Sequence, residues 1–134
     1  MKTIDILTIG NITEDINIIN NIVYKSIGGT SFYAYKVVEK LGYDLRIITK
    51  LSDKFNVSKK IDLTKIIPQR TDLHTIFENT YKDGIRNQKI LNKSGKIISK
   101  KLSKKLKKFN PKIVFYCPIF DEIDSDFFNL FNKS

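Results

Sequence analysis

Short apolar runs separated by polar segments dominate the chain, and they predict a buried sheet. Residues 4–9 and 112–117 are mostly apolar, residues 46–51 contain Ile47, Ile48 and Leu51, and Gly10 and Pro118 end the first and the last of these runs. Runs of four to eight apolar residues bounded by glycine or proline are typical of strands buried on both faces. We therefore expect three buried strands that are far apart in the sequence and close together in the fold.

The segment between the first two strands has helical spacing. Residues 32–41 repeat large side chains at Tyr33, Val37 and Leu41, and Gly42 follows directly. A threonine and a serine stand in front of this segment, where they would cap a helix, and glycine is a common C-terminal stop. A strand–helix–strand unit implies parallel strands joined by a right-handed crossover. The fold class we expect is therefore α/β.

Two further segments read as β-hairpins set apart from that sheet. An Asn-Asn pair lies within residues 16–24, and Asp83-Gly84 separates the runs 75–81 and 85–91. Asparagine, aspartate and glycine tolerate the positive φ angles that two-residue hairpin turns require. We expect one face of the second hairpin to be polar and half exposed, with Glu78, Thr80, Arg86 and Gln88 on it.

The last third of the chain predicts two more helices. Residues 94–109 are very basic, and Ile98, Leu102, Leu106 and Phe109 fall on one helical stripe that Asn110-Pro111 would end. Residues 121–131 follow with acidic residues in the expected first turn, which suits a helix N-terminus. Three parallel strands with so few helices make a thin domain, because a parallel sheet needs cover on both faces. The chain resembles the first part of something larger.

Composition narrows the function classes only slightly. The chain has 134 residues and a net charge of +10 from 24 Lys+Arg against 14 Asp+Glu, which fits one domain. Lysine outnumbers arginine 21 to 3, and isoleucine and asparagine are also abundant, as A/T-rich codons would produce without selection for a basic surface. The single cysteine, Cys117, excludes an intramolecular disulfide. No apolar run is long enough to span a membrane and no secretory signal is visible, so we expect a cytoplasmic location.

The basic segment gives one alternative function. Eight lysines fall within residues 93–108, and a small basic α/β module could bind nucleic acid through such a helix. Nucleic-acid surfaces usually also contain arginines and aromatic stacking platforms, and residues 93–108 contain neither. We therefore favour a solvated helix face and keep nucleic-acid binding as the alternative.

Three features occur in a fixed order along the chain. Asp15 follows Gly10 by five residues, at the end of the first strand. A Gly28-Gly29 pair then opens the helix that ends in Leu41-Gly42, and the run 46–53 follows it as strand and turn. Near the end, Glu122 follows the proline that stops the third strand.

This arrangement resembles the N-terminal part of the ribokinase/PfkB family of sugar and nucleoside kinases, and the resemblance covers nearly the whole chain. It implies a ribokinase-like Rossmann-type three-layer αβα fold, incomplete here, with a small β lid from residues 11–27 and 74–91. It also implies an acceptor site for a sugar, nucleoside or polyol. The substrate-binding residues would be Thr13, Asp15, Gly28, Gly29, Thr30, Tyr33 and Glu122.

The chemistry of these residues is consistent with that site, and purely structural roles for several of them stay open. A carboxylate can accept two sugar hydroxyls in strong charge-assisted hydrogen bonds, and paired glycines let the backbone approach a ligand. Asp15 could also be a turn former, Tyr33 a packing residue, and Glu122 a helix-start carboxylate. Tyr33 stands where the family often has a sugar-contacting asparagine, which departs from a simple ribokinase pattern.

The catalytic signature of the family is absent from this sequence. The motif D-T-x-G-A-G-D, which holds the transferring phosphate and supplies the general base, occurs nowhere in the 134 residues. The resemblance implies ATP and Mg²⁺ in a complete enzyme, and no catalytic, cofactor-binding or metal-binding residue in this chain. We expect a truncated or split kinase that is inactive alone and that either self-associates or joins a second chain. A remnant that binds a polyol without catalysis is a further possibility.

Overall fold

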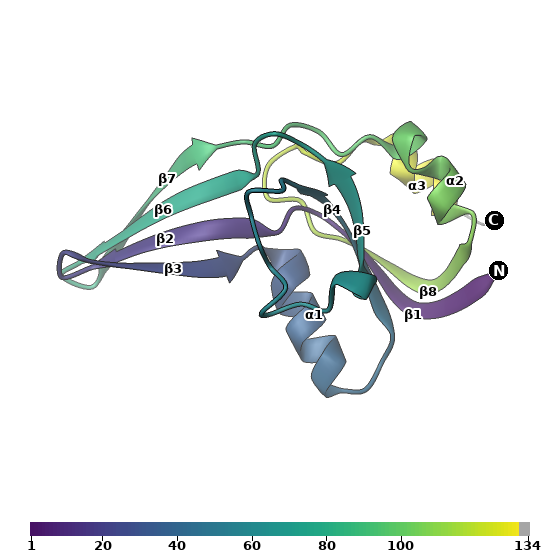
Figure 1. Cartoon of the computed structure of the whole chain (residues 1–134), viewed down its shortest axis with the longest axis horizontal. Coiled ribbons are helices and arrows are strands. Elements are labelled where there is room, and N and C mark those ends of the chain that lie inside the picture. Colours follow the sequence, from purple (N-terminus) through teal and green to yellow (C-terminus); the bar gives the residue numbers. More distant parts are fainter. Residues whose placement is uncertain (132–134) are drawn as a thin grey trace.

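The computed structural model describes residues 1–131 and contains two four-stranded sheets (Figure 1). The first sheet is entirely parallel, with the strand order β5-β4-β1-β8. Its strands are β1 (Lys2–Ile9), β4 (Leu45–Leu51), β5 (Ile66–Arg70) and β8 (Phe109–Tyr116). The two earlier strand predictions are confirmed within one or two residues, and β5 is an addition that the sequence pattern did not reveal. Proline at its third position obscured the apolar run.

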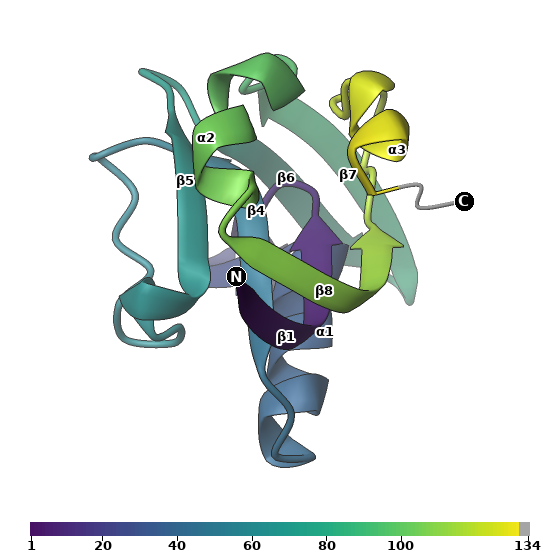
Figure 2. The ribbon, with the colours of Figure 1, turned by 90° about the vertical axis from the view of Figure 1, so that its right-hand side faces the viewer.

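Helices cover both faces of the parallel sheet, as such a sheet requires (Figure 2). Helix α1 (Thr30–Lys40) lies on one face, and α2 (Ser103–Leu106) and α3 (Asp126–Phe131) lie on the other. Successive side chains of a strand point to opposite faces, so Ile47 joins the cluster under α1 while Ile48 joins the cluster under α2 and α3. A three-layer α/β architecture is therefore confirmed.

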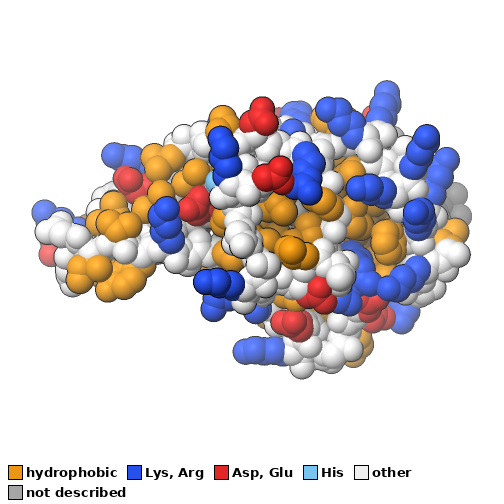
Figure 3. All heavy atoms as spheres, in the orientation of Figure 1, with side chains coloured by type: hydrophobic (Ala, Val, Ile, Leu, Met, Phe, Trp, Pro, Cys, Tyr) orange, Lys and Arg blue, Asp and Glu red, His pale blue; other side chains and the backbone are white. Residues whose placement is uncertain are grey.

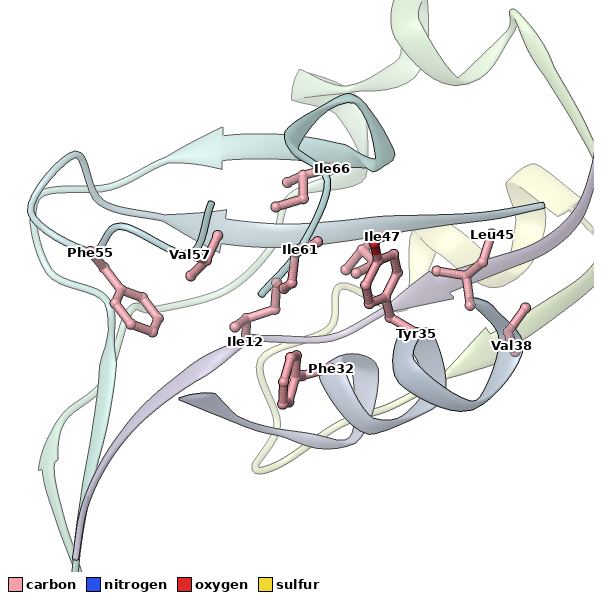
Figure 4. Close-up of a cluster of buried hydrophobic side chains, with 10 residues drawn as sticks. All are labelled: Ile12, Phe32, Tyr35, Val38, Leu45, Ile47, Phe55, Val57, Ile61 and Ile66. Carbon is pink, nitrogen blue, oxygen red and sulfur yellow. The ribbon is translucent and has the colours of Figure 1, made fainter. Parts of the chain in front are cut away.

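The core under α1 contains ten buried hydrophobic side chains (Figure 4). Phe32, Tyr35 and Val38 recur at helical spacing and face the sheet. The irregular segment 52–62 adds Phe55, Val57 and Ile61 to this cluster, and the short turn η1 (Leu63–Lys65) leads from it into β5. The helix begins without a side-chain cap, because Gly29 occupies the N-cap position in place of the expected Thr or Ser. Gly42, at φ 79°, follows the helix as predicted.

The second sheet, here called the hairpin sheet, projects from one end of the parallel sheet (Figure 1). It contains β2 (Thr13–Ile19), β3 (Ile22–Gly28), β6 (Thr75–Lys82) and β7 (Ile85–Asn92), in the order β3-β2-β6-β7. Both hairpins are confirmed, and their turn residues Asn20, Asn21, Asp83 and Gly84 all have positive φ. The parallel pairing of β2 with β6 joins them into one sheet.

The predicted polar face of the second hairpin is wrong. Arg86 pairs with Tyr81, and Gln88 pairs with Asn79, so Arg86 and Gln88 lie on the face opposite to Glu78. Thr80 shares the face of Glu78, because residues two apart on a strand point the same way. The two-residue turn at Asp83-Gly84 pairs Lys82 with Ile85, so even-numbered residues of β6 from Glu78 to Lys82 pair with odd-numbered residues of β7.

The long basic helix predicted over 94–109 is also wrong. Only the turn η2 (Ser99–Lys101) and the four-residue α2 are helical there. Other segments of the same chain keep the beginning of this region extended. The Ile97 N–H donates to the Glu122 carbonyl at 2.7 Å. The Gln69 side chain bonds both the N–H and the carbonyl of Ile98. Tertiary hydrogen bonds thus override a helical apolar stripe.

The end of the described chain differs from prediction in two further ways. Strand β8 begins at Phe109 and contains Pro111, so the Asn-Pro pair starts a strand where a helix end was expected. β8 is an edge strand, and Ile113 and Phe115 are exposed in place of being buried. Helix α3 spans only Asp126–Phe131, because residues 121–125 form a loop. None of the described helices has the length and apolarity needed to cross a bilayer.

Candidate functional site

Asp15 lies near the start of β2, where the hairpin sheet leaves the parallel sheet. Its carboxylate is partly buried, and the Thr13 hydroxyl donates to Oδ1 at 2.8 Å. Thr13 itself is buried. The hydrogen bond fixes one carboxylate oxygen, so the carboxylate has a defined orientation at the junction of the two sheets.

Glycine at position 28 makes room for that carboxylate. Gly28 pairs with Thr13 across β2 and β3, and a Cβ built on it would lie 2.3 Å from the Asp15 Oδ2. No side chain fits there without displacing the carboxylate. Gly29 has a φ of 94°, and a Cβ on it would lie 2.5 Å from the Asn11 carbonyl oxygen. Both positions of the predicted pair therefore require glycine, because neighbouring atoms lie too close for a side chain.

The surroundings of Asp15 also change its acidity. Burial raises the pKa of the Asp15 carboxyl above its usual value, while the Thr13 hydrogen bond and the charge of Arg86 oppose that rise. A carboxylate that has lost part of its hydration has unsatisfied hydrogen-bonding capacity. Hydroxyl groups of a ligand could supply the missing donors.

Asn11 connects the segments that meet at this junction, a role that no sequence pattern predicted. Its side chain is buried, donates to the Ser94 Oγ at 2.7 Å and accepts from the Lys50 N–H at 3.1 Å. The Ser94 N–H in turn donates to the Thr75 Oγ1 at 3.3 Å. One amide thus ties the end of β4 to the segment after β7. An isolated asparagine in a loop carries no sequence signal for such a network.

An aromatic wall lies beside Asp15. Phe77 is the direct partner of Asp15 across β2 and β6, so their side chains share one face of the hairpin sheet. The Phe77 ring lies 6.3 Å from the Phe120 ring, and the Lys93 ammonium lies 5.0 Å above the latter. These rings were not among the predicted site residues, because Phe77 and Phe120 are distant in sequence and look like ordinary core residues.

Glu122 acts inside the loop after β8. Its side chain is 1% exposed, and its carboxylate accepts hydrogen bonds from the N–H groups of Ile119 and Phe120 at 2.8 to 3.1 Å. The side chain therefore positions the loop that presents Phe120 next to Phe77. This geometry makes Glu122 a positioning residue of the site, not the helix-start carboxylate that the sequence also allowed.

Thr30 and Tyr33 lie elsewhere. Both are exposed and line a hollow of about 400 Å³ between α1 and β8, together with Ile113 and Phe115. Among the described residues, neither side chain donates a hydrogen bond to Thr13 or Asp15. The structure thus brings together Thr13, Asp15, Gly28 and Gly29, with Glu122 behind them, and separates Thr30 and Tyr33 from this group.

Comparison with known proteins identifies the fold. No protein-family model matches the sequence, and no curated protein matches it. Solved structures do match, among them a pyrophosphate-dependent kinase of the ribokinase family complexed with a pyrophosphate analogue and myo-inositol. It aligns with a TM-score of 0.74 and 19% identity over 93% of this chain and 44% of its own length.

Two other sugar kinases align over similar lengths. The fructokinase of Halothermothrix orenii matches with a TM-score of 0.64 and 15% identity over 84% of this chain and 45% of its own. The ribokinase of Arabidopsis thaliana, complexed with ribose and ATP, matches with a TM-score of 0.64 and 12% identity over 97% of this chain and 49% of its own. This chain spans less than half the length of these structures. It therefore has the fold of the N-terminal part of ribokinase-family kinases.

Proposed function

We propose that this chain supplies the acceptor-binding part of a kinase that phosphorylates an alcohol group of a sugar or polyol. The observation that carries the proposal is the Asp15 carboxylate, partly buried, oriented by Thr13 and given space by Gly28. A carboxylate so placed can accept two ligand hydroxyls in charge-assisted hydrogen bonds. The matched structures that contain myo-inositol and ribose support a polyhydroxylated ligand.

The neighbouring residues suit such a ligand. Phe77 shares the face of Asp15 and offers an apolar surface to the carbon skeleton of a ring. The backbone around Gly28 and Gly29 can approach a ligand closely, because neither residue has a side chain. In this proposal the hairpin sheet acts as the lid expected from residues 11–27 and 74–91, and it excludes water from the reacting hydroxyl.

Phosphoryl transfer needs more than this chain contains. Its sequence lacks the motif that, in the family it resembles, supplies the general base and the phosphate-binding helix N-terminus. The resemblance implies ATP and Mg²⁺ for a complete enzyme, and we assign neither group to a described residue. We expect the 134-residue chain to bind an acceptor and to transfer no phosphate by itself.

We also propose a surface on this chain that binds a partner polypeptide. Strand β8 has an open edge, and beside it Ile113, Phe115, Tyr33 and Val37 are 45% to 59% exposed. Exposed apolar patches next to an unpaired strand favour association. We propose that this face receives a polypeptide that adds a strand beside β8 and carries the remaining half of the kinase fold. In its absence we expect self-association.

The alternative function loses its structural basis. Nucleic-acid binding was expected through a helix over residues 93–108, and only short helical turns form there. Basic side chains are spread over the visible face of the molecule with acidic ones among them (Figure 3). No observation favours a nucleic-acid partner over a small-molecule ligand.

Isothermal titration calorimetry with myo-inositol, ribose and fructose tests the acceptor site. We expect at least one of them to bind the wild-type chain and to lose affinity in the Asp15→Asn variant. The Asp121→Asn variant is a matched control, because it removes one carboxylate from an exposed site. Equal binding by wild type and Asp15→Asn would remove the basis of the proposal.

A further inference from the structure

A second hollow, here called the lysine groove, lies on the other face of the hairpin sheet. Lys25, Ser26 and Ile27 of β3 line it. Lys25 and Ile27 point away from the face of Asp15, while Ser26 pairs with Asp15 and shares its face. The groove has a volume of about 670 Å³. Most of its lining therefore lies apart from Asp15, and Ser26 lies between the groove and the acceptor site.

Five lysines from three parts of the chain converge on this groove: Lys25, Lys36, Lys54, Lys59 and Lys60. The lone carboxylate that lines it, Glu14, lies 3.5 Å from the Lys25 ammonium and 2.6 Å from the His74 Nε2. Lys54, Lys59 and Lys60 form no ion pair with any residue in the range 1–131. A concave surface with an excess of one sign of charge concentrates ions of the other sign.

The floor of the groove is apolar and firmly held. Phe32 and Phe55 are 8% and 9% exposed and belong to the cluster under α1 (Figure 4). The Phe55 ring stacks on His74 with 4.4 Å between ring centroids. Ligand sites for small molecules are usually concave and apolar, with a few charged groups that fix orientation. A floor of this kind suits a flat organic ring.

We propose that the lysine groove binds an organic polyphosphate, with its phosphates among the lysines and its ring on the Phe32 and Phe55 floor. The volume suits a small molecule of nucleotide size, since such sites span roughly 300 to 1,000 Å³. Binding there links β3 to the segment that carries Lys54, Lys59 and Lys60. A ligand in the groove would thereby favour one position of the hairpin sheet relative to the parallel sheet.

Calorimetric titration of the full chain with ATP in EDTA tests this proposal. The Lys54→Gln/Lys59→Gln/Lys60→Gln variant removes three unpaired exposed charges from the groove and leaves the core intact. The Lys104→Gln/Lys105→Gln/Lys107→Gln variant removes the same charge from exposed lysines near α2. We expect affinity for ATP to fall at least tenfold in the first variant and less than twofold in the second.

Three results would overturn the proposal. The first is no ATP binding by the wild-type chain, and the second is an equal loss in both variants, which would indicate binding through net charge alone. The third is tripolyphosphate binding as tightly as ATP, which would remove the organic ring from the assignment. ATP contains a ribose diol, so the Asp15→Asn variant is titrated as well: unchanged ATP affinity there keeps the assignment to the lysine groove, and a lost affinity would place ATP at the acceptor site and also overturn it.

Discussion

At the scale of single residues, Asp15 combines a function with an energetic penalty. Its pKa is raised by burial, so the folded state holds a proton more tightly than the unfolded chain does. Stability contributed by this group is therefore present at low pH and is lost as the pH rises through the raised pKa. At neutral pH the charged carboxylate opposes folding, which is typical of a residue kept for binding.

The Asp15→Asn variant should separate these two effects. We expect the melting temperature at pH 7 to stay the same or rise, because the desolvated charge is gone. Acceptor affinity should fall roughly 10- to 100-fold, since a hydrogen bond to a charged group contributes about 1.5–3 kcal/mol. Thermal melts and calorimetry on the same samples check both. A lowered melting temperature with unchanged affinity would make Asp15 a structural residue.

The same reasoning predicts a pH dependence of acceptor binding. Affinity of the wild-type chain should decrease as the pH falls and Asp15 becomes protonated. Because the pKa is raised, the midpoint should lie above about 3.9, the usual value for aspartate. A titration series between pH 7 and pH 4 measures it, and the Asp15→Asn variant should show no such midpoint.

Gly28 offers an independent test at the same point. In the Gly28→Ala variant the new Cβ meets the Asp15 carboxylate at 2.3 Å, so we expect about tenfold weaker acceptor binding and a loss of roughly 1–3 kcal/mol in stability. In Gly10→Ala the Cβ meets the Cys117 carbonyl oxygen at 2.1 Å, and backbone yields less easily than a side chain. Denaturant titrations should therefore show the larger loss for Gly10→Ala.

At the scale of elements, local signals predicted well and long-range contacts did not. The hairpins followed from turn residues such as Asp83-Gly84, whose conformational needs are local. The basic helix failed because Ile97 and Ile98 bond to Glu122 and Gln69, partners that a periodicity cannot reveal. At the site, the glycine pair and Asp15 were predictable. Phe77, Phe120 and Asn11 were not, since Phe77 is placed by the pairing of β2 with β6, Phe120 by the loop that Glu122 holds, and Asn11 by its hydrogen bonds to Ser94 and the Lys50 N–H.

The loop that presents Phe120 should depend on Glu122. Replacing its buried carboxylate in Glu122→Gln puts an NH₂ donor next to the N–H groups of Ile119 and Phe120, with an expected loss of about 1–3 kcal/mol. Hydrogen exchange should show faster opening of residues 118–122. The neighbouring Asp121 side chain is 91% exposed, so the Asp121→Asn variant should change stability by less than about 0.5 kcal/mol. Equal exchange in both variants would contradict the positioning role.

At the scale of the whole molecule, the two edges of the parallel sheet differ. β5 keeps Ile66 and Ile67 buried, while β8 leaves an open edge next to exposed Ile113 and Phe115. The matched structures are more than twice as long as the aligned part. The partner surface proposed above lies on this apolar face.

The oligomeric state of the chain in solution tests whether that apolar face binds a partner. We expect the wild-type chain to sediment as a concentration-dependent oligomer, because apolar area beside an open edge favours pairing. The Ile113→Thr/Phe115→Thr variant should shift it toward monomer while keeping β-forming residues. Leu63→Thr/Leu73→Thr removes apolar side chains that are about equally exposed elsewhere and should leave association unchanged. A monomeric wild-type chain would count against the partner surface.

The central claim is that the junction around Asp15 binds a polyol. Amide chemical shifts of ¹⁵N-labelled chain, recorded during titration with myo-inositol, ribose and fructose, test it most directly. The account predicts saturable shifts at Asp15, Gly28 and Gly29 with at least one ligand, and their disappearance in Asp15→Asn. No saturable shift with any of the three, or shifts confined to residues away from this junction, would contradict it.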